Sequence, residues 1–306
     1  MNTQLTLSIA TLAILVTVSA GAQEASLMAA AAPSTPVVQP WMNTEVGAAW
    51  SQGYRGQGVT VTVVDDFKSS SVFRGNLSAK SEVLRHGQWT FKETSLIAPS
   101  ATMVSQDYRS GKKVALNKGL NVINLSYGMM APAGYSKVGW SAQETSIIDY
   151  ARNGTAIISK AAGNDSGVAV GAKTKAGQID YLGRDLIGAQ SAIFVGALSS
   201  NGTKTAPAKL ATYSNVAGTN VEVQKKFLVV GVSSGSTGLQ GTSFAAPIIS
   251  GYAAILGSKF TKSTPTQITN QLLSTARTDT ISGYNAAIHG RGEATIARAL
   301  APVSIK

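Results

Sequence analysis

Five short runs of apolar and β-branched residues recur along the chain, and segments with helical periodicity separate some of them. Runs of this length are typical of buried strands. Strands that alternate with helices predict a mostly parallel sheet flanked by helices, with functional groups at the carboxyl ends of the strands. The predicted strands cover residues 59–64, 121–125, 155–159, 193–197 and 227–232.

Two predicted helices carry clear start signals. Ser141-Ala142-Gln143-Glu144 forms a capping box, and Asn153-Gly154 ends the helix that it opens. Near the C-terminus, Thr264-Pro265-Thr266-Gln267 opens another helix with proline in its first turn.

Composition limits the chemistry of the chain. Its 306 residues suffice for one large domain, and no cysteine is available for a disulfide or a thiol nucleophile. Only two histidines are present, which disfavours a metal site with several histidine ligands. The net charge of +11 favours anionic partners, but Lys and Arg are dispersed, so nucleic-acid binding is not expected.

The N-terminal segment predicts export. Residues 5–18 are apolar, and Ala20-Gly21-Ala22 fits a small-x-small cleavage pattern. We expect a signal peptide over 1–22, a short leader or linker over 23–40, and one folded domain over 41–306. A membrane anchor is the alternative, although the apolar run is short for a span. The expected product is secreted, periplasmic or extracellular, without a stable membrane anchor after signal cleavage.

The most distinctive motif is Gly241-Thr242-Ser243-Phe244-Ala245-Ala246-Pro247, which leads into an apolar helical stretch. It places a serine beside the free N–H groups and positive dipole of a buried helix start. Such a position stabilises a developing negative charge, as acyl transfer requires. Taken alone, Ser243 is more simply explained as the N-cap of a core helix.

Three other polar residues follow predicted strands or precede glycine. Asp65 closes the strand 59–64, where it could orient a histidine, bind a metal or cap a turn. His86 precedes a glycine and is either a general base or a surface histidine. Asn164 follows a strand and could donate to an oxyanion or occupy an ordinary Gly-Asn turn.

One further segment is suited to hold an extended peptide. The strand 121–125 runs into Ser126, Tyr127 and Gly128, where an exposed backbone could pair with a substrate. The alternative is an ordinary core strand.

Together, in the order Asp65, His86, Asn164 and Ser243, these segments resemble the motifs of the subtilase (subtilisin-like) family of serine proteases. The resemblance extends over about residues 37–306 and implies a three-layer α/β fold. It implies that Ser243 is the nucleophile, His86 its proton acceptor and Asp65 the partner that orients the imidazole. It further implies oxyanion binding by Asn164, backbone pairing of substrate with Leu125, Ser126, Tyr127 and Gly128, and a side-chain pocket lined by Ala161, Ala162 and Gly163.

The chain departs from the family pattern around Asp65 and His86. A second carboxylate, Asp66, follows Asp65, but alternation along a strand lets only one of them face His86, and we choose Asp65. The segment between His86 and Ile97-Ala98-Pro99 is shorter than in subtilisin-type members. The resemblance therefore implies that their strong calcium site is absent, and we expect no metal or other cofactor.

Two charges flank the implied pocket. If Asp165 reaches its rim, basic side chains in the substrate would be favoured. The simpler interpretation is that Lys160 and Asp165 are solvated loop charges.

The resemblance implies a serine endopeptidase that acts on peptide or protein substrates through an acyl-enzyme, and we expect it to be secreted and monomeric. One alternative is a catalytically inactive binding or inhibitory protein of the same fold. Another is an α/β solute-binding protein, which would need two similar lobes that the sequence lacks.

Overall fold

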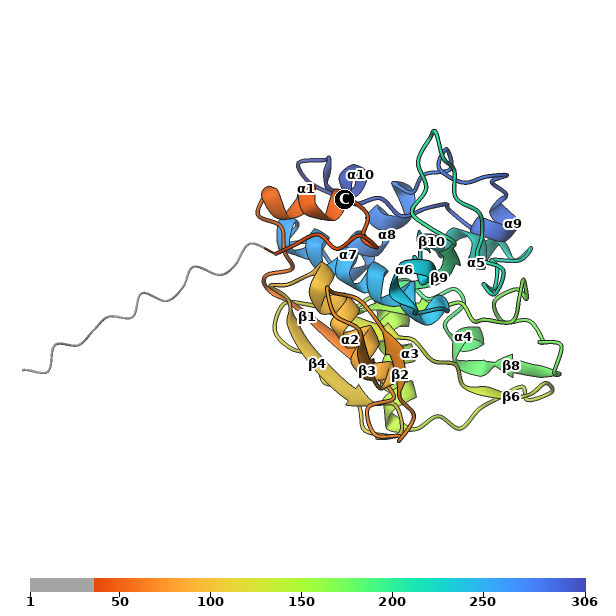
Figure 1. Ribbon diagram of the computed structural model, residues 1–306. Coiled ribbons are helices and arrows are strands. Elements are labelled where there is room, and N and C mark those ends of the chain that lie inside the picture. The colour runs from red at the N-terminus through yellow and green to blue at the C-terminus, as the bar shows by residue number, and fades with distance from the viewer. Residues whose placement is uncertain (1–35) are drawn as a thin grey trace, which may run out of the picture. The chain divides into compact units, whose positions relative to one another are not determined.

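A parallel sheet of six strands, in the order β10-β9-β7-β5-β1-β4, forms the centre of the fold (Figure 1). All five pairings between its neighbouring strands are parallel. The predicted fold class, a mostly parallel sheet flanked by helices, is confirmed. The strands are β1 (Val59–Asp65), β4 (Thr102–Asp107), β5 (Leu120–Leu125), β7 (Ile157–Ala161), β9 (Ala192–Leu198) and β10 (Phe227–Gly231).

The computed structural model describes residues 36–306. The predicted signal peptide, 1–22, and residues 23–35 of the predicted leader lie outside the described residues. Within 36–306, no helix combines the length and apolar character that crossing a membrane requires.

Two groups of helices cover the sheet. The first group is α1 (Glu45–Ser51), α2 (His86–Ile97), α7 (Ala246–Lys259), α8 (Pro265–Ser274) and α10 (Ile296–Leu300). The second group is α3 (Ala142–Asn153), α4 (Tyr181–Asp185) and α5 (Val221–Lys225). The remaining elements are two antiparallel pairs, β2 (Phe73–Gly75) with β3 (Glu82–Leu84) and β6 (Met130–Pro132) with β8 (Gln178–Asp180), and the short helices α6 (Ser234–Thr237), η1 (Thr242–Phe244) and α9 (Ala286–His289).

Successive residues of the central strands contribute to two separate apolar cores. Val122 of β5 and Leu228 of β10 pack in the core beneath the first group of helices. Their next neighbours, Ile123 and Val229, pack in the core beneath the second group. Side chains alternate along a strand, so a sheet covered on both faces needs apolar residues at nearly every position. This requirement explains the continuous apolar runs of the sequence.

Both predicted helix starts are confirmed, but the predicted capping box at Ser141 is not formed, because Ser141 accepts from the second helical residue and not from the third. The Ser141 hydroxyl accepts from the Gln143 amide at 3.1 Å at the start of α3, which ends at Gly154 with φ of 65°. The Thr264 hydroxyl accepts from the Gln267 amide at 3.2 Å at the start of α8. These caps satisfy backbone groups that the helix ends would leave unpaired.

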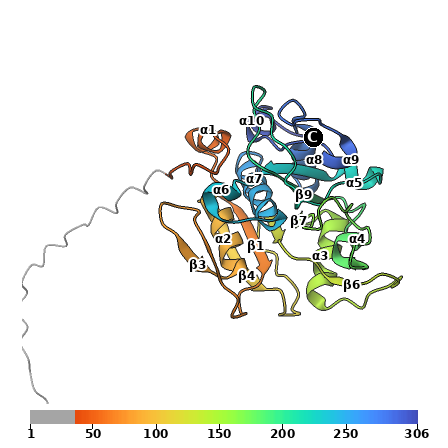
Figure 2. The same cartoon turned by 45° about the vertical axis from the view of Figure 1, so that its right-hand side comes forward.

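Helices α2 and α7 lie side by side on one face of the sheet (Figures 1 and 2). Gly251 of α7 permits this approach, because a Cβ atom there would lie 2.5 Å from Cγ2 of Ile97. The Thr94 hydroxyl also donates to the carbonyl of Pro247 at 3.2 Å. Close packing of this kind transmits shifts readily, so each helix fixes the position of the other.

Helix α2 contains a buried carboxyl group, that of Glu93, which is 3% exposed. Among the described residues, its Oε2 has no hydrogen-bond partner. Burial raises the pKa of Glu93 well above its ordinary value of 4.5. The folded protein therefore keeps a proton that the unfolded chain releases. The contribution of Glu93 to stability is complete below pH 4.5 and is lost as the pH rises toward the folded-state pKa.

We expect Glu93→Gln to stabilise the protein at pH 7, by about 1.4 kcal/mol for each unit by which burial raises the pKa of Glu93, because the amide has no proton that the unfolded chain can release. At pH 4 the same substitution should change stability little, since the native carboxyl is then neutral in both states. Thermal unfolding at the two pH values measures this difference, with the exposed Glu222→Gln as the control. An equal shift in melting temperature at both pH values would contradict the assignment.

Candidate active site

Asp65 and His86 meet at the carboxyl end of β1. Asp65 is the last residue of the strand and is 1% exposed, and His86 is the first residue of α2. His86 Nδ1 lies 2.6 Å from Asp65 Oδ1. A carboxylate at Nδ1 holds the proton on that nitrogen and leaves Nε2 able to accept one. The pair is therefore arranged as an oriented general base.

Thr90 completes the surroundings of Asp65. Its hydroxyl donates to Asp65 Oδ2 at 3.0 Å, while the amide of Asp66 donates to Oδ1 at 2.6 Å. Thr90 was not among the residues predicted from the sequence. Its position one helical turn after His86 is a signal that could have identified it, because residues four apart share a helix face.

Asp66 has a different environment. Its Oδ1 accepts from the amides of Lys68 and Ser69, at 3.3 and 2.9 Å, and its Oδ2 accepts from the Ser69 hydroxyl. Desolvation favours the neutral acid, but the hydrogen bonds from Ser69 and Lys68 outweigh it and lower the pKa of Asp66. The structure thus brings Asp65, and not Asp66, to His86.

Ser243 lies in the short 3-10 turn η1, immediately before α7, and is 8% exposed. Its hydroxyl donates to the carbonyl of Ser126 at 3.0 Å, and the Ser126 hydroxyl donates to the carbonyl of Ser243 at 2.8 Å. This reciprocal pair ties the serine turn to the end of β5. The ring of the next residue, Phe244, lies 5.8 Å from the ring of His86, centroid to centroid.

The helix after Ser243 begins later than the sequence predicts. The N-cap of α7 is Ala245, so Ser243 is not its N-cap and the simpler local interpretation is wrong. Pro247 explains the start, because proline is favoured in the first turn of a helix, where its missing N–H costs nothing.

Asn164 faces the serine turn with its amide oxygen already engaged. Oδ1 accepts from the backbone amide and the hydroxyl of Thr242, at 2.8 and 3.0 Å. Among the described residues, no acceptor is recorded for its Nδ2, and the residue is exposed. Gly241 has φ of 130°, and a Cβ atom there would lie 3.2 Å from that Nδ2. The site therefore holds an oriented amide donor beside Ser243.

A cavity of about 290 Å³ opens between Ser243 and the ends of β5 and β7. Six residues of the predicted substrate segments line it together with Asn164 and Ser243, namely Ser126, Tyr127, Gly128, Ala161, Ala162 and Gly163.

Leu125 departs from the prediction. Its side chain is fully buried, and its backbone is paired on one side with Val64 of β1 and on the other with Lys160 of β7. No edge remains at Leu125 for a substrate strand, and the backbone without strand pairing begins only at Ser126.

The charged residues at this cavity include one that departs from the prediction, Lys160, and one that was not predicted, Asp180. Lys160 is 2% exposed, and its Nζ lies 2.8 Å from Asp180 Oδ2. The interpretation of Lys160 as a solvated loop charge is therefore wrong. Asp180 was missed, since an aspartate before a short helix normally signals only a cap. Asp165 also lines the cavity.

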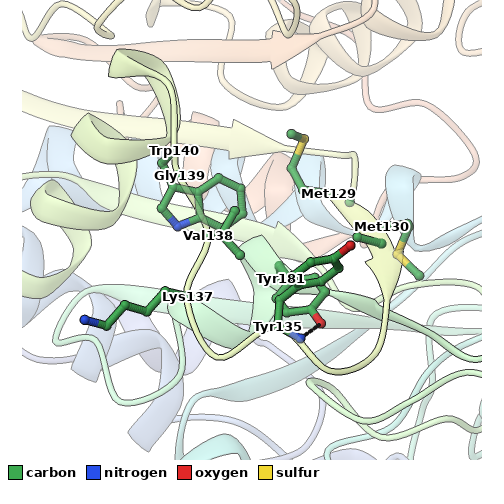
Figure 3. A pocket seen from close by; sticks show the side chains of 10 residues that line it. Met129, Met130, Tyr135, Lys137, Val138, Gly139, Trp140 and Tyr181 are labelled. Carbon is green, nitrogen blue, oxygen red and sulfur yellow. Dashed lines mark hydrogen bonds between the residues drawn. The ribbon is translucent and has the colours of Figure 1, made fainter.

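A second cavity, of about 640 Å³, shares Gly128 and Met130 with the first. The rings of Tyr135, Trp140 and Tyr181 line it (Figure 3), and the polar atoms of Trp140 and Tyr181 are engaged elsewhere. The Tyr181 hydroxyl donates to the carbonyl of Pro132 at 2.8 Å, and Trp140 Nε1 donates to Asp185 Oδ2 at 2.8 Å. The cavity consequently presents mainly apolar faces.

The other histidine lies outside this site. His289 of α9 is 3% exposed, contacts the backbone of Asn285 and stacks on Tyr284 at 6.0 Å between ring centroids. Burial lowers its pKa. Across residues 36–306, no group of three or more His, Cys, Asp or Glu side chains is arranged to hold a metal ion.

Comparisons with known proteins identify a family and relatives of this chain. The model of the subtilase family matches residues 96–292. Subtilisin DY of Bacillus licheniformis is 30% identical over 167 residues, which cover 55% of this chain and 53% of that protein. The chain thus spans about half the length of the curated relative that it matches.

Solved structures show the same fold at low identity. The prenylagaramide maturation protease PagA is 20% identical, with a TM-score of 0.53 over 83% of this chain and 96% of that chain. MycP1 from the ESX-1 type VII secretion system is 19% identical, with a TM-score of 0.55 over 88% of this chain and 87% of that chain.

Proposed function

Because this chain belongs to the subtilase family, we propose that it is a secreted serine endopeptidase with Asp65, His86 and Ser243 as its catalytic triad. The observation that carries the proposal is the 2.6 Å contact between His86 Nδ1 and Asp65 Oδ1. The ring of His86 lies 5.8 Å from that of Phe244, the residue after Ser243, and Ser243 and Asn164 line one cavity. An oriented base, a serine and an amide donor are the groups that acyl transfer requires.

The reaction begins at the serine hydroxyl. Its proton is held by the carbonyl of Ser126 in this structure, so the side chain rotates before His86 Nε2 accepts the proton. Ser243 Oγ then bonds to the carbonyl carbon of the peptide. Asn164 Nδ2 and the backbone N–H of Ser243 donate to the resulting oxyanion.

Collapse of the intermediate breaks the carbon–nitrogen bond. His86 gives its proton to the departing amine, and the acyl group remains on Ser243. Water, deprotonated by His86, then repeats the attack and releases the acid. Throughout, Asp65 stabilises the charged imidazole without itself accepting a proton.

Substrate would lie along the backbone of Ser126–Gly128 (residues 126–128), as an added strand beyond the end of β5. Because the hydrogen bonds of such a strand involve only backbone groups, recognition there is independent of sequence. An internal peptide bond can be held in this way, which supports endopeptidase rather than terminal cleavage.

A fluorophosphonate probe tests the proposal directly. Attack by Ser243 Oγ on phosphorus would expel fluoride and leave a covalent phosphonyl serine, with the proton passing to His86. We expect stoichiometric labelling of the folded protein, mapped by mass spectrometry to Ser243, and none after denaturation. Failure of the folded protein to label at Ser243 would favour the alternative, an inactive binding or inhibitory protein of subtilase fold.

A further inference from the structure

The cavity beside Ser243 is lined by three charged side chains, those of Lys160, Asp165 and Asp180. One positive and two negative charges give it a formal charge of −1. Small residues at positions 128 and 161–163 form much of the remaining wall and leave room for an entering side chain. Which of the three charges an entering group meets depends on how each is held.

Lys160 is withdrawn behind Asp180. Its ammonium donates to Asp180 Oδ2 and to the carbonyl of Ala161, both at 2.8 Å, and the side chain is 2% exposed. The side chain of Asp180 is 21% exposed. A buried ammonium needs an opposite charge beside it, and Asp180 supplies that charge. The exposed partner of this ion pair is therefore the carboxylate.

Asp180 is fixed by the surrounding backbone. Its Oδ1 accepts from the amide of Met129 at 2.9 Å. Cβ atoms added to Gly128 and Gly183 would lie 3.2 and 2.8 Å from its Oδ2, so both glycines are packed against the carboxylate. Each carboxylate oxygen has about two acceptor positions, and each of these two uses one within the protein. Asp180 thus presents pre-oriented, unfilled acceptor positions.

Asp165 supplies the charge that Lys160 does not neutralise. Its Oδ2 accepts from Nδ2 of Asn215 at 3.0 Å, and its amide donates to Oδ1 of the same asparagine at 2.7 Å. These bonds fix its position with a neutral partner. Within residues 36–306, no Lys or Arg forms an ion pair with Asp165.

We propose that this cavity selects Lys or Arg as the substrate residue whose carbonyl is attacked, with Asp165 as the charge partner and Asp180 as the acceptor at the floor. The proposal rests on the proposed peptidase function. A cationic, donor-rich side chain satisfies both carboxylates. An apolar side chain leaves them desolvated without donors, and an acidic one adds like charge. Lys160 is a positioning residue that holds Asp180 in place.

Three fluorogenic octapeptides that differ only in one residue, Lys, Leu or Glu, test the proposal. For the wild-type protein we expect kcat/KM to be about tenfold or more higher for the Lys peptide than for Leu, and lowest for Glu. Asp165→Asn should remove about tenfold from the Lys value and change the Leu value little. The exposed Asp149→Asn, on α3 and outside the cavity, is the matched control and should leave all three values unchanged.

The double variant Lys160→Met with Asp180→Asn provides a second test, since changing one partner alone leaves a buried charge unpaired. It should lower the preference for Lys over Leu and keep the melting temperature close to that of the wild type. The inference would be overturned if the three peptides were cleaved equally, or if Glu were preferred, while Ser243 still labelled normally. That result would leave the proposed function intact. Absence of both cleavage and labelling would overturn both.

Discussion

Replacing Ser243 by alanine is expected to lower kcat/KM for peptide hydrolysis by about 10⁴-fold or more, because the covalent step then has no nucleophile. The loss should fall on kcat, with KM little changed, since the walls of the cavity remain. A residual rate above that of uncatalysed hydrolysis is expected from Asn164 and substrate binding alone. Steady-state kinetics on any peptide that the wild type cleaves measure the change.

The same substitution should lower the stability of the folded protein only slightly. Ser243→Ala removes one hydrogen bond, from its hydroxyl to the carbonyl of Ser126, which is worth about 0.5–1.5 kcal/mol. The exposed Ser236→Ala, in α6, is the control for loss of a surface hydroxyl. A Ser243→Ala protein that keeps its fold and also keeps a tenth or more of its activity would exclude Ser243 as the nucleophile.

The sequence predicts the buried strands well but does not predict β4, the half-exposed strand at one edge of the sheet. Strands such as β5 and β10 are covered on both faces, so they need apolar residues at successive positions and stand out in the sequence. The edge strand β4, Thr102–Asp107, has only Asp107 buried and mixes polar with apolar residues. Nothing in its composition separates it from a loop, and only its pairing with β1 makes it a strand.

The catalytic residues could be predicted because their signals are local in the sequence. Asp65, His86, Asn164 and Ser243 each belong to a contiguous motif, and their order along the chain relates them to one another. The structure also brings Asp65 and His86 together, at a strand end and a helix start where the sequence predicts functional groups.

The charges of the cavity could not be predicted in this way. Asp180 reaches Lys160 because β8 pairs with β6 and so returns to the end of β7. That pairing involves strands of three residues, which give almost no sequence signal. Lys160 therefore appears in the sequence without a partner, and the simplest interpretation placed it in solvent. Burial of a lysine becomes evident only when the opposing carboxylate is located in space.

The adjacent carboxylates Asp65 and Asp66 allow a sharp test of the proposed triad. Asp65→Asn should lower kcat by about 10⁴-fold, because an amide at this position no longer fixes the proton on His86 Nδ1 and cannot stabilise the imidazolium. Asp66→Asn should leave kcat nearly unchanged, since the Asp66 carboxylate accepts from Lys68 and Ser69 and not from His86. Both substitutions remove one negative charge at neighbouring positions, so general electrostatic effects of that loss should be similar. Steady-state kinetics of the two variants would therefore isolate the contact with His86. If kcat fell equally in both variants, or fell more in Asp66→Asn, the 2.6 Å contact between His86 and Asp65 would not be what orients His86 as the general base.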